Sequence, residues 1–171
     1  MITVPSRQRK FLQRLHSVEK AATFLAFLVL IGALFLDVVY REFTGVGLHW
    51  ARQVGVYANI VVVMLGLGLA SAGGAHLRPR FADHWLPKNW EPVLQRLQEG
   101  LMALFCLGFG LLALQITLQA WQLQERSILI GVVVWPIMAV MPLAFFIATV
   151  RHGLYAWTPE LRPDDAQDRN E

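Results

Sequence analysis

Four apolar runs, each about as long as a membrane-spanning helix, constrain the fold of this chain more than any other feature. A spanning helix needs about 20 mostly apolar residues, because the hydrocarbon core is about 30 Å thick and each residue rises about 1.5 Å. Of the 171 residues, 56% are hydrophobic and only 16% are charged. We therefore predict an all-α integral membrane protein with four transmembrane helices, at about residues 21–40, 54–75, 100–123 and 127–150.

Polar residues within these runs are few, and those near the middle are uncharged. Asp37 lies close to the end of the first run, and Asn59 lies in the second. Gln115, Gln119 and Gln122 share one helix face near the end of the third run, where we expect them to hydrogen-bond across helices. Transporter cores and proton relays place ionisable residues in mid-membrane, so the lack of them in these runs argues against a self-contained transporter.

The Lys and Arg residues indicate how the chain crosses the membrane, because positively charged flanks are retained on the cytoplasmic side. The side that carries both termini has most of these residues, whereas the other side has only Arg41, Arg52 and Arg126. We therefore expect both termini to be cytoplasmic. The predicted organisation is an N-terminal segment, a four-helix membrane domain and a polar tail, at 1–20, 21–155 and 156–171.

The stretch that follows the second run changes abruptly from small residues to charged and aromatic ones. It reads SAGGAHLRPRFADHWLP, and its His76 and Arg78 can meet water and lipid headgroups at the membrane surface. From about 79 to 99, apolar residues recur at helical spacing, which predicts an amphipathic segment in the interface. The alternative is a connecting loop whose Trp85 and Trp90 belong to the aromatic belt. Under both interpretations these side chains anchor the cytoplasmic rim.

A face of small residues lies near the end of the second run. Gly66, Ala70 and Gly74 are four residues apart, which places them on one side of a helix and lets another backbone approach closely. Two uses of this face remain open. It serves either helix packing within the bundle or contact with another subunit.

Asp37 and Arg41 form the nearest approach to a charged site. They are four residues apart with the acid first, so they can pair on one helix face. Both lie at the membrane boundary, and we interpret them as a solvated or headgroup-contacting pair rather than a catalytic one. We predict no enzymatic activity, no metal or cofactor bound by this chain, and no nucleic-acid partner, because the basic residues form no single patch.

The histidines leave one alternative function open, because a four-helix membrane bundle can hold haem b between two imidazoles. His76 and His152 both sit at the cytoplasmic ends of predicted spans, so a pair at one depth is conceivable. Neither lies inside a span, and the chain has no haem-attachment motif. The alternative is thus a haem b- or quinone-binding subunit of a redox complex, and an absorption spectrum without a Soret band would exclude the haem.

Five short stretches match the pattern of a known family. VVYREF (38–43) matches the Arg-aromatic exit from the first span, and GLHW (47–50) matches the Trp before the second span. GGAHLR (73–78) matches the Gly-His exit from the second span, and WLP (85–87) matches the Leu-Pro that follows it. SILIGVVVWPIMAVMP (127–142) matches the Ser, Gly, Trp and Pro pattern of the fourth span. Over about 17–155 the chain thereby resembles the small membrane subunit (DctQ-like) of a tripartite ATP-independent periplasmic (TRAP) transporter.

The resemblance implies an accessory function in the bacterial inner membrane. In such systems a periplasmic binding protein captures an organic acid, a large multi-spanning subunit moves it with sodium, and the small subunit braces the large one. The family pattern includes Ser127, Trp135 and Pro136. Arg41 and Trp50 are candidates for the periplasmic rim, as membrane anchors or as contacts for the binding protein.

The chain departs from the family pattern at one place. Members usually carry an acidic pair directly after the Trp region, whereas Ala51, Arg52 and Gln53 stand there in this sequence. The role of that acidic pair is therefore carried over to no residue of this chain. We expect Arg52 instead to alter a charge contact with a partner.

Overall fold

The computed structural model describes residues 6–72 and 91–158. Within these ranges every regular element is a helix, apart from one isolated β-bridge between Arg126 and Val133. The helices are α1 (Ser6–Thr44), α2 (His49–Ala72), α3 (Glu91–Gln122), α4 (Trp135–Met138) and α5 (Val140–Trp157). In the part of the chain that the structure describes, four segments are long and apolar enough to cross a membrane: Lys10–Thr44, His49–Ala70, Arg96–Gln122 and Trp135–Trp157. The prediction of an all-α membrane protein is thus confirmed.

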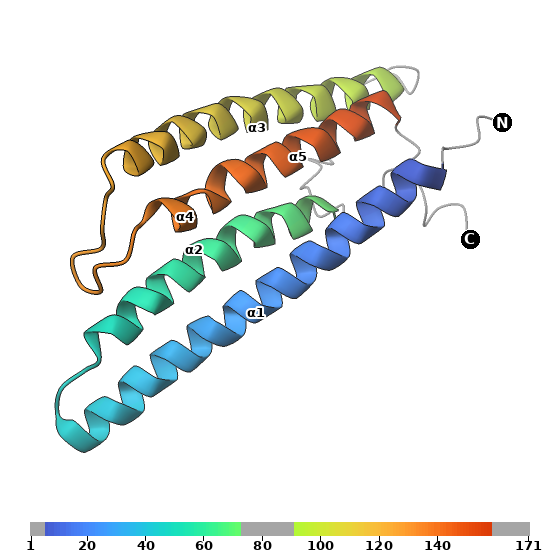
Figure 1. Cartoon of the computed structure of the whole chain (residues 1–171). Helices are drawn as coiled ribbons and strands as arrows, with labels where there is room; N and C mark the ends of the chain where they lie inside the picture. Colours follow the sequence, from blue (N-terminus) through green and yellow to red (C-terminus); the bar gives the residue numbers. More distant parts are fainter. Residues whose placement is uncertain (1–5, 73–90, 159–171) are drawn as a thin grey trace, which may run out of the picture.

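The helices form two antiparallel hairpins that lie side by side (Figure 1). The first hairpin pairs α1 with α2, the second pairs α3 with α5, and contacts between α2 and α5 join them. The order across the array is therefore α1, α2, α5, α3, which leaves α1 and α3 at its two edges. We call the end where α1 begins and α5 finishes the Arg151 end, and the opposite end the Asp37 end.

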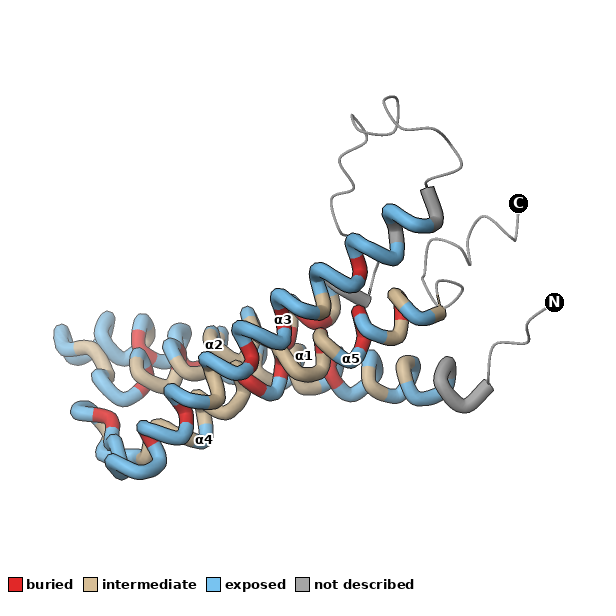
Figure 2. Tube along the Cα trace, turned by 90° about the horizontal axis from the view of Figure 1, so that it is seen from above, coloured by how far each residue is buried: buried red, intermediate tan, exposed pale blue. Residues whose placement is uncertain are grey.

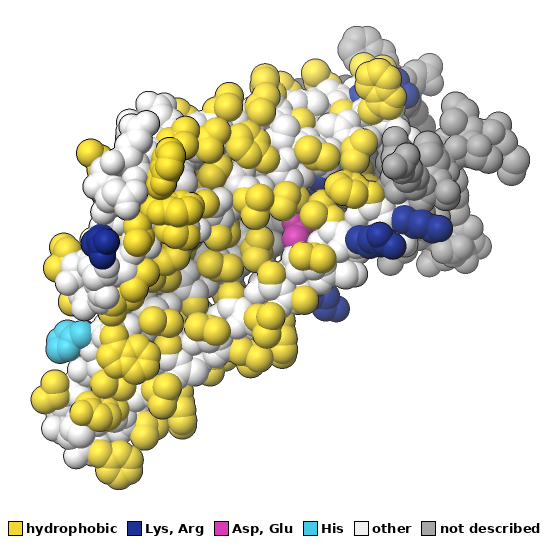
Figure 3. All heavy atoms as spheres, viewed as in Figure 1, with side chains coloured by type: hydrophobic (Ala, Val, Ile, Leu, Met, Phe, Trp, Pro, Cys, Tyr) yellow, Lys and Arg dark blue, Asp and Glu magenta, His cyan; other side chains and the backbone are white. Residues whose placement is uncertain are grey.

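The interior of this array is built from small side chains, and the bulky apolar ones point outward. Figure 2 shows buried positions only as short patches along the four long helices, and Figure 3 shows apolar side chains over most of the visible face. Such an arrangement suits a bilayer, because lipid solvates the large side chains while small residues let backbones pack closely. The buried apolar residues include Ala33, Ala51, Ala58, Ala120, Ala144 and Ala148.

Two prolines divide the fourth membrane segment into α4 and α5. Pro136 is in the first turn of α4 and Pro142 in the first turn of α5, where a helix leaves its backbone N–H groups unpaired in any case. Neither proline therefore needs the help from neighbouring helices or water that a mid-helix proline would require. The helical part begins at Trp135 rather than at the predicted Ser127, because 123–134 form a connection with positive φ at Gln124 and Gly131.

The described part of the third membrane segment begins as the sequence predicts. Glu91 opens α3 and Pro92 follows it in the first turn, the position where proline is best tolerated. Residues 91–99 of the predicted interfacial segment thus belong to α3 itself. The rest of that segment lies outside the described residues, as do the candidate site residues Gly74, His76, Arg78, Trp85 and Trp90.

Candidate functional site

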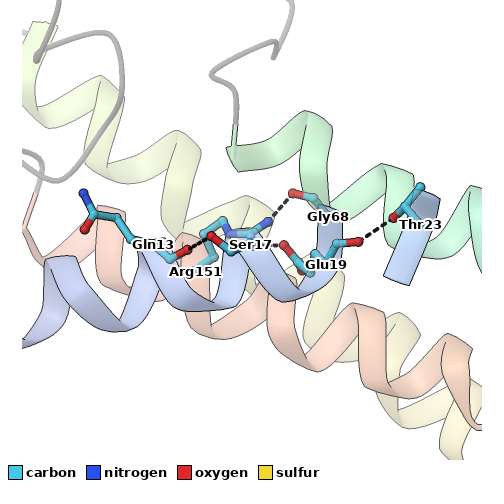
Figure 4. Close-up of polar contacts among 6 residues, drawn as sticks. All are labelled: Gln13, Ser17, Glu19, Thr23, Gly68 and Arg151. Carbon is cyan, nitrogen blue, oxygen red and sulfur yellow. Dashed lines mark hydrogen bonds and ion pairs between the residues drawn. The ribbon is translucent and has the colours of Figure 1, made fainter. Parts of the chain in front are cut away.

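A buried ion pair connects three helices at the Arg151 end (Figure 4). Arg151 of α5 donates from Nη2 to Oε2 of Glu19 in α1 and from Nη1 to the carbonyl oxygen of Gly68 in α2. The side chains of Arg151 and Glu19 are only 1% and 4% exposed. A charge removed from solvent is tolerated when a partner neutralises it and its hydrogen bonds are made, and this guanidinium satisfies both conditions.

The lack of a side chain at Gly68 makes this arrangement possible. A Cβ at that position would lie 2.7 Å from Oε1 of Glu19 and 3.6 Å from Nη1 of Arg151. The nearby hydroxyls of Ser17 and Thr23 donate to carbonyl oxygens of α1 itself, so they do not compete for the ion pair. Near the end of α2, the glycine in close contact is therefore Gly68 and not Gly66.

We predict that Gly68→Ala destabilises the bundle by about 1–3 kcal/mol, the range for a methyl group forced into a packed site. The Glu19 carboxylate cannot move away cheaply, because it is held by Arg151. Gly66→Ala is the matched control: its Cβ would meet nothing within 4 Å, so alanine should be neutral or up to about 1 kcal/mol stabilising through helix propensity. Denaturation in detergent measures both, and equal stabilities of the two variants would contradict the geometry.

The residue after Arg151 makes the second buried contact. Nδ1 of His152 lies 2.7 Å from Oε2 of Glu99 in α3, and the ring donates when that carboxyl group is ionised. His152 also stands edge-on to Tyr155, with ring centroids 6.3 Å apart. Adjacent residues of α5 thus reach in different directions, Arg151 to α1 and α2 and His152 to α3. Helix α5 is therefore the element that ties all the long helices together at this end.

A third polar contact closes the Asp37 end. Asp37 of α1 is buried, and its Oδ1 accepts the backbone N–H of Leu48 at 2.5 Å, just before α2 begins. Nε of Arg52 lies 3.7 Å from the other carboxylate oxygen. A Cβ at Gly47 would come within 2.9 Å of Asp37 Oδ1, so glycine is needed for this close approach. The structure thereby corrects the predicted solvated pair of Asp37 and Arg41: the ion-pair partner of Asp37 is Arg52, and Arg41 is exposed.

We predict that Asp37→Ala destabilises the bundle by about 1–2 kcal/mol, the cost of removing a side-chain cap from a helix start. Asp37→Asn keeps a carbonyl oxygen for the Leu48 N–H and should lose less than half as much. The contribution of Arg52 is small, because a half-exposed ion pair adds less than about 1 kcal/mol. Unfolding curves of the two Asp37 variants decide this, and an Asn variant as unstable as the Ala variant would contradict the capping role of Asp37.

The predicted small-residue face does not pack within this chain at its described positions. Open space surrounds Gly66, and Ala70 is exposed. Of the two uses left open by the sequence, contact with another subunit remains a prediction. The three glutamines of α3 also differ from expectation: Gln115, Gln119 and Gln122 are exposed on the outside of the bundle instead of hydrogen-bonding across its helices.

The remaining candidate residues lie at the Asp37 end and are not brought into one site. Trp50 is exposed in the first turn of α2, and Trp135 and Pro136 open α4. Ser127 is buried in the connection before α4, where its backbone N–H donates to Val132. Among the described residues no group of three or more His, Cys, Asp or Glu side chains is placed to hold a metal ion.

Comparison of the sequence with known protein families gives one match. The model of the DctQ component of tripartite ATP-independent periplasmic transporters matches residues 30–159, well over half of the chain. The chain belongs to the DctQ family. No curated protein and no solved structure gives a match. DctQ proteins are the small membrane component of TRAP transporters, so this chain is a multi-pass membrane subunit of such a transporter.

Within this DctQ protein, sequence reasoning missed Glu19, Glu99 and the pairing role of Arg151. The prediction of orientation counts only Lys and Arg at the membrane flanks. An additional count of acidic residues would have found Glu19 before the first span and Glu99 before the third, on the same side as Arg151 and His152 after the fourth. Opposite charges at one end of a helix bundle are the signal that was available.

Proposed function

We propose that this DctQ chain is an accessory subunit that braces the large multi-spanning subunit of its TRAP transporter. The transporter takes up an organic acid with sodium after a periplasmic binding protein has delivered it. The chain lies in the bacterial inner membrane with both termini in the cytoplasm, in agreement with the excess of Lys and Arg on that side. It binds no cofactor and has no enzymatic activity.

The family match carries this proposal, and the disposition of charge in the described residues supports it. Carriers commonly place ionisable side chains within the membrane, where these groups mark substrate and ion pathways. The buried cationic side chain described in the bundle, Arg151, is already neutralised by Glu19. The same contacts tie α5 to α1, α2 and α3, which suits a part that stays fixed while another part of the complex moves.

Purification in mild detergent tests the assignment of the partner. The tagged chain is isolated from its native membrane, and the proteins that accompany it are identified by mass spectrometry. We expect one large polytopic membrane protein in a one-to-one ratio. Recovery of redox subunits, together with a Soret band, would instead favour the haem-binding alternative, and recovery of the chain alone would refute the proposed complex.

A further inference from the structure

The outward side of α3 is unlike a lipid-facing surface. The side that packs toward α5 contains buried residues such as Cys106, Gly110, Thr117 and Ala120. The opposite side, which we call the outer face of α3, is exposed throughout and follows the helical period. Its members are Leu101, Leu104, Gly108, Leu112, Gln115 and Gln119.

The outer face is grooved. A Cβ at Gly108 would meet nothing within 4 Å, so this position is an open notch between larger side chains. One hollow runs from Leu101 past Gly108 to Gln115, and a second runs from Leu111 to Gln122. The two hollows are shallow and share Leu111 and Gln115, so they adjoin along the helix, and we call them together the groove.

The groove ends in amide side chains that have no partner in the described chain. Gln115, Gln119 and Gln122 are exposed, and none of the three side chains hydrogen-bonds to another described residue. A carboxamide has two N–H donors and a carbonyl acceptor. Hydrocarbon satisfies none of them, whereas another helix with polar side chains can satisfy them all.

The depth of Gln115 places its amide in hydrocarbon. The span Arg96–Gln122 has 27 residues and is roughly 40 Å long, which exceeds the hydrocarbon thickness of about 30 Å. If the excess is shared between the ends, hydrocarbon begins roughly 5 Å inside Gln122. Gln115 is seven residues, or roughly 10 Å, from Gln122 along the helix axis, so it lies roughly 5 Å inside the hydrocarbon. Gln122 is thus at the level of the headgroups, whereas the backbone of Gln115 is within the hydrocarbon.

The other edge of the array offers a comparison. The exposed side of α1 within its apolar stretch includes Phe24, Leu28, Ile31 and Phe35, which are side chains that lipid solvates well. Helix α3 occupies the opposite edge and carries amides at the corresponding outward positions. The two edges thus face different surroundings, and the α3 edge is the one suited to protein.

We propose that the outer face of α3 binds a membrane-spanning helix of the large transport subunit. The bound helix places an apolar side chain over Gly108 and a neutral hydrogen-bonding side chain, such as Ser, Thr, Asn or Gln, opposite Gln115. It carries no charge at this depth, because α3 has no ionised group between Glu99 and Gln122 to pair with one. This proposal rests on the function proposed above and names the surface through which it operates.

Photocrosslinking identifies the occupant of the groove. Gln115 is replaced by benzoylphenylalanine in the full chain, which is expressed with the rest of its transporter and irradiated in membranes. We expect one product with the mass of this chain plus the large subunit. The same replacement at Leu28 on the outer side of α1 is the control and should give no such product. A product with the mass of two copies of this chain, or no protein product at all, would overturn the proposal.

Two leucine variants test the hydrogen bonds independently. Gln115→Leu combined with Gln119→Leu removes the amides but keeps a lipid-compatible helix, so the bundle itself should insert and fold. We expect recovery of the large subunit with this variant to fall at least tenfold, and Gln98→Leu, the same change on an exposed part of α3 outside the groove, to leave it unchanged. Normal recovery with the double variant would refute the role of the amides.

These experiments separate the two proposals. If the unmodified chain brings down no large subunit, the proposed function fails. If it brings down the large subunit while the Gln115 probe and the double variant behave like the Leu28 and Gln98 controls, only the assignment of the face is wrong. Asn59 is the exposed amide of α2. A crosslinked product, or a loss of large-subunit recovery, that occurs only when Asn59 is changed would place the interface on α2 instead.

Discussion

Arg151→Met should lower the free energy of unfolding of this bundle by about 3–5 kcal/mol, the range for a buried ion pair that loses one partner. The variant leaves the Glu19 carboxylate, which is 4% exposed, without its counter-charge, and it removes the donor to the Gly68 carbonyl. Unfolding in detergent, followed by intrinsic tryptophan fluorescence during titration with SDS, measures the loss. A change below about 1 kcal/mol would mean that the pair is exposed in solution.

A second variant shows whether the loss comes from the unpaired charge. Glu19→Met combined with Arg151→Met removes both charges and leaves side chains that pack, and such replacements of buried pairs are often neutral or stabilising. We expect the double variant to recover most of the stability that Arg151→Met loses. Arg52→Met is the matched control, because its guanidinium is 56% exposed and should contribute less than about 1 kcal/mol. A double variant no more stable than Arg151→Met alone would show that other interactions of Arg151 dominate.

Glu99→Ala is expected to have the second largest effect, a loss of about 1–3 kcal/mol. The change removes the acceptor 2.7 Å from Nδ1 of His152, and the side chain of His152 is only 1% exposed, so water cannot easily take its place. The contact also joins α3 to α5, and α3 carries the outer face described above. The variant should therefore weaken the docking of α3 on the bundle as well as total stability.

Glu99→Gln is the control for this contact, because its amide oxygen can still accept the Nδ1–H. We expect it to lose less than half of what Glu99→Ala loses. Stability is measured as for Arg151, and hydrogen exchange of α3 amides localises the effect to that helix. Equal stability of the Ala and Gln variants would contradict a hydrogen-bonding role for Glu99. A loss of amide protection spread evenly over α1 and α3 would contradict a local effect on α3.

The fold was predictable from the sequence because hydropathy and helix length are local properties. The apolar runs locate the middle parts of α1, α2 and α3, and Pro92 marks the start of α3, but α1 begins at Ser6, well before the run predicted at 21–40. The start of the fourth helix was not predictable in the same way. The run from Ser127 to Val134 is as apolar as a helix, and only the turn geometry at Gly131 and the proline at 136 separate it from α4.

The candidate site was less predictable because its contacts link residues far apart in the chain. Glu19 and Arg151 meet only after two hairpins have packed, and Asp37 has two possible arginine partners, Arg41 in its own helix and Arg52 in the next. A local rule selects Arg41 because it is four residues away, whereas the turn between α1 and α2 brings Arg52 to the carboxylate. Similarly, Gly66 fits a spacing pattern, but the position of Arg151 determines that Gly68 is the packed glycine.

Reconstituted uptake tests the central claim most directly. Proteoliposomes are prepared with this chain alone, with the large subunit alone and with both, each with the binding protein, a sodium gradient and the organic acid that the binding protein retains on purification. The bracing function predicts uptake only when both membrane subunits are present, and reduced uptake with Arg151→Met at equal amounts of inserted protein. Uptake by this chain alone, or full uptake by the large subunit without it, would contradict the claim.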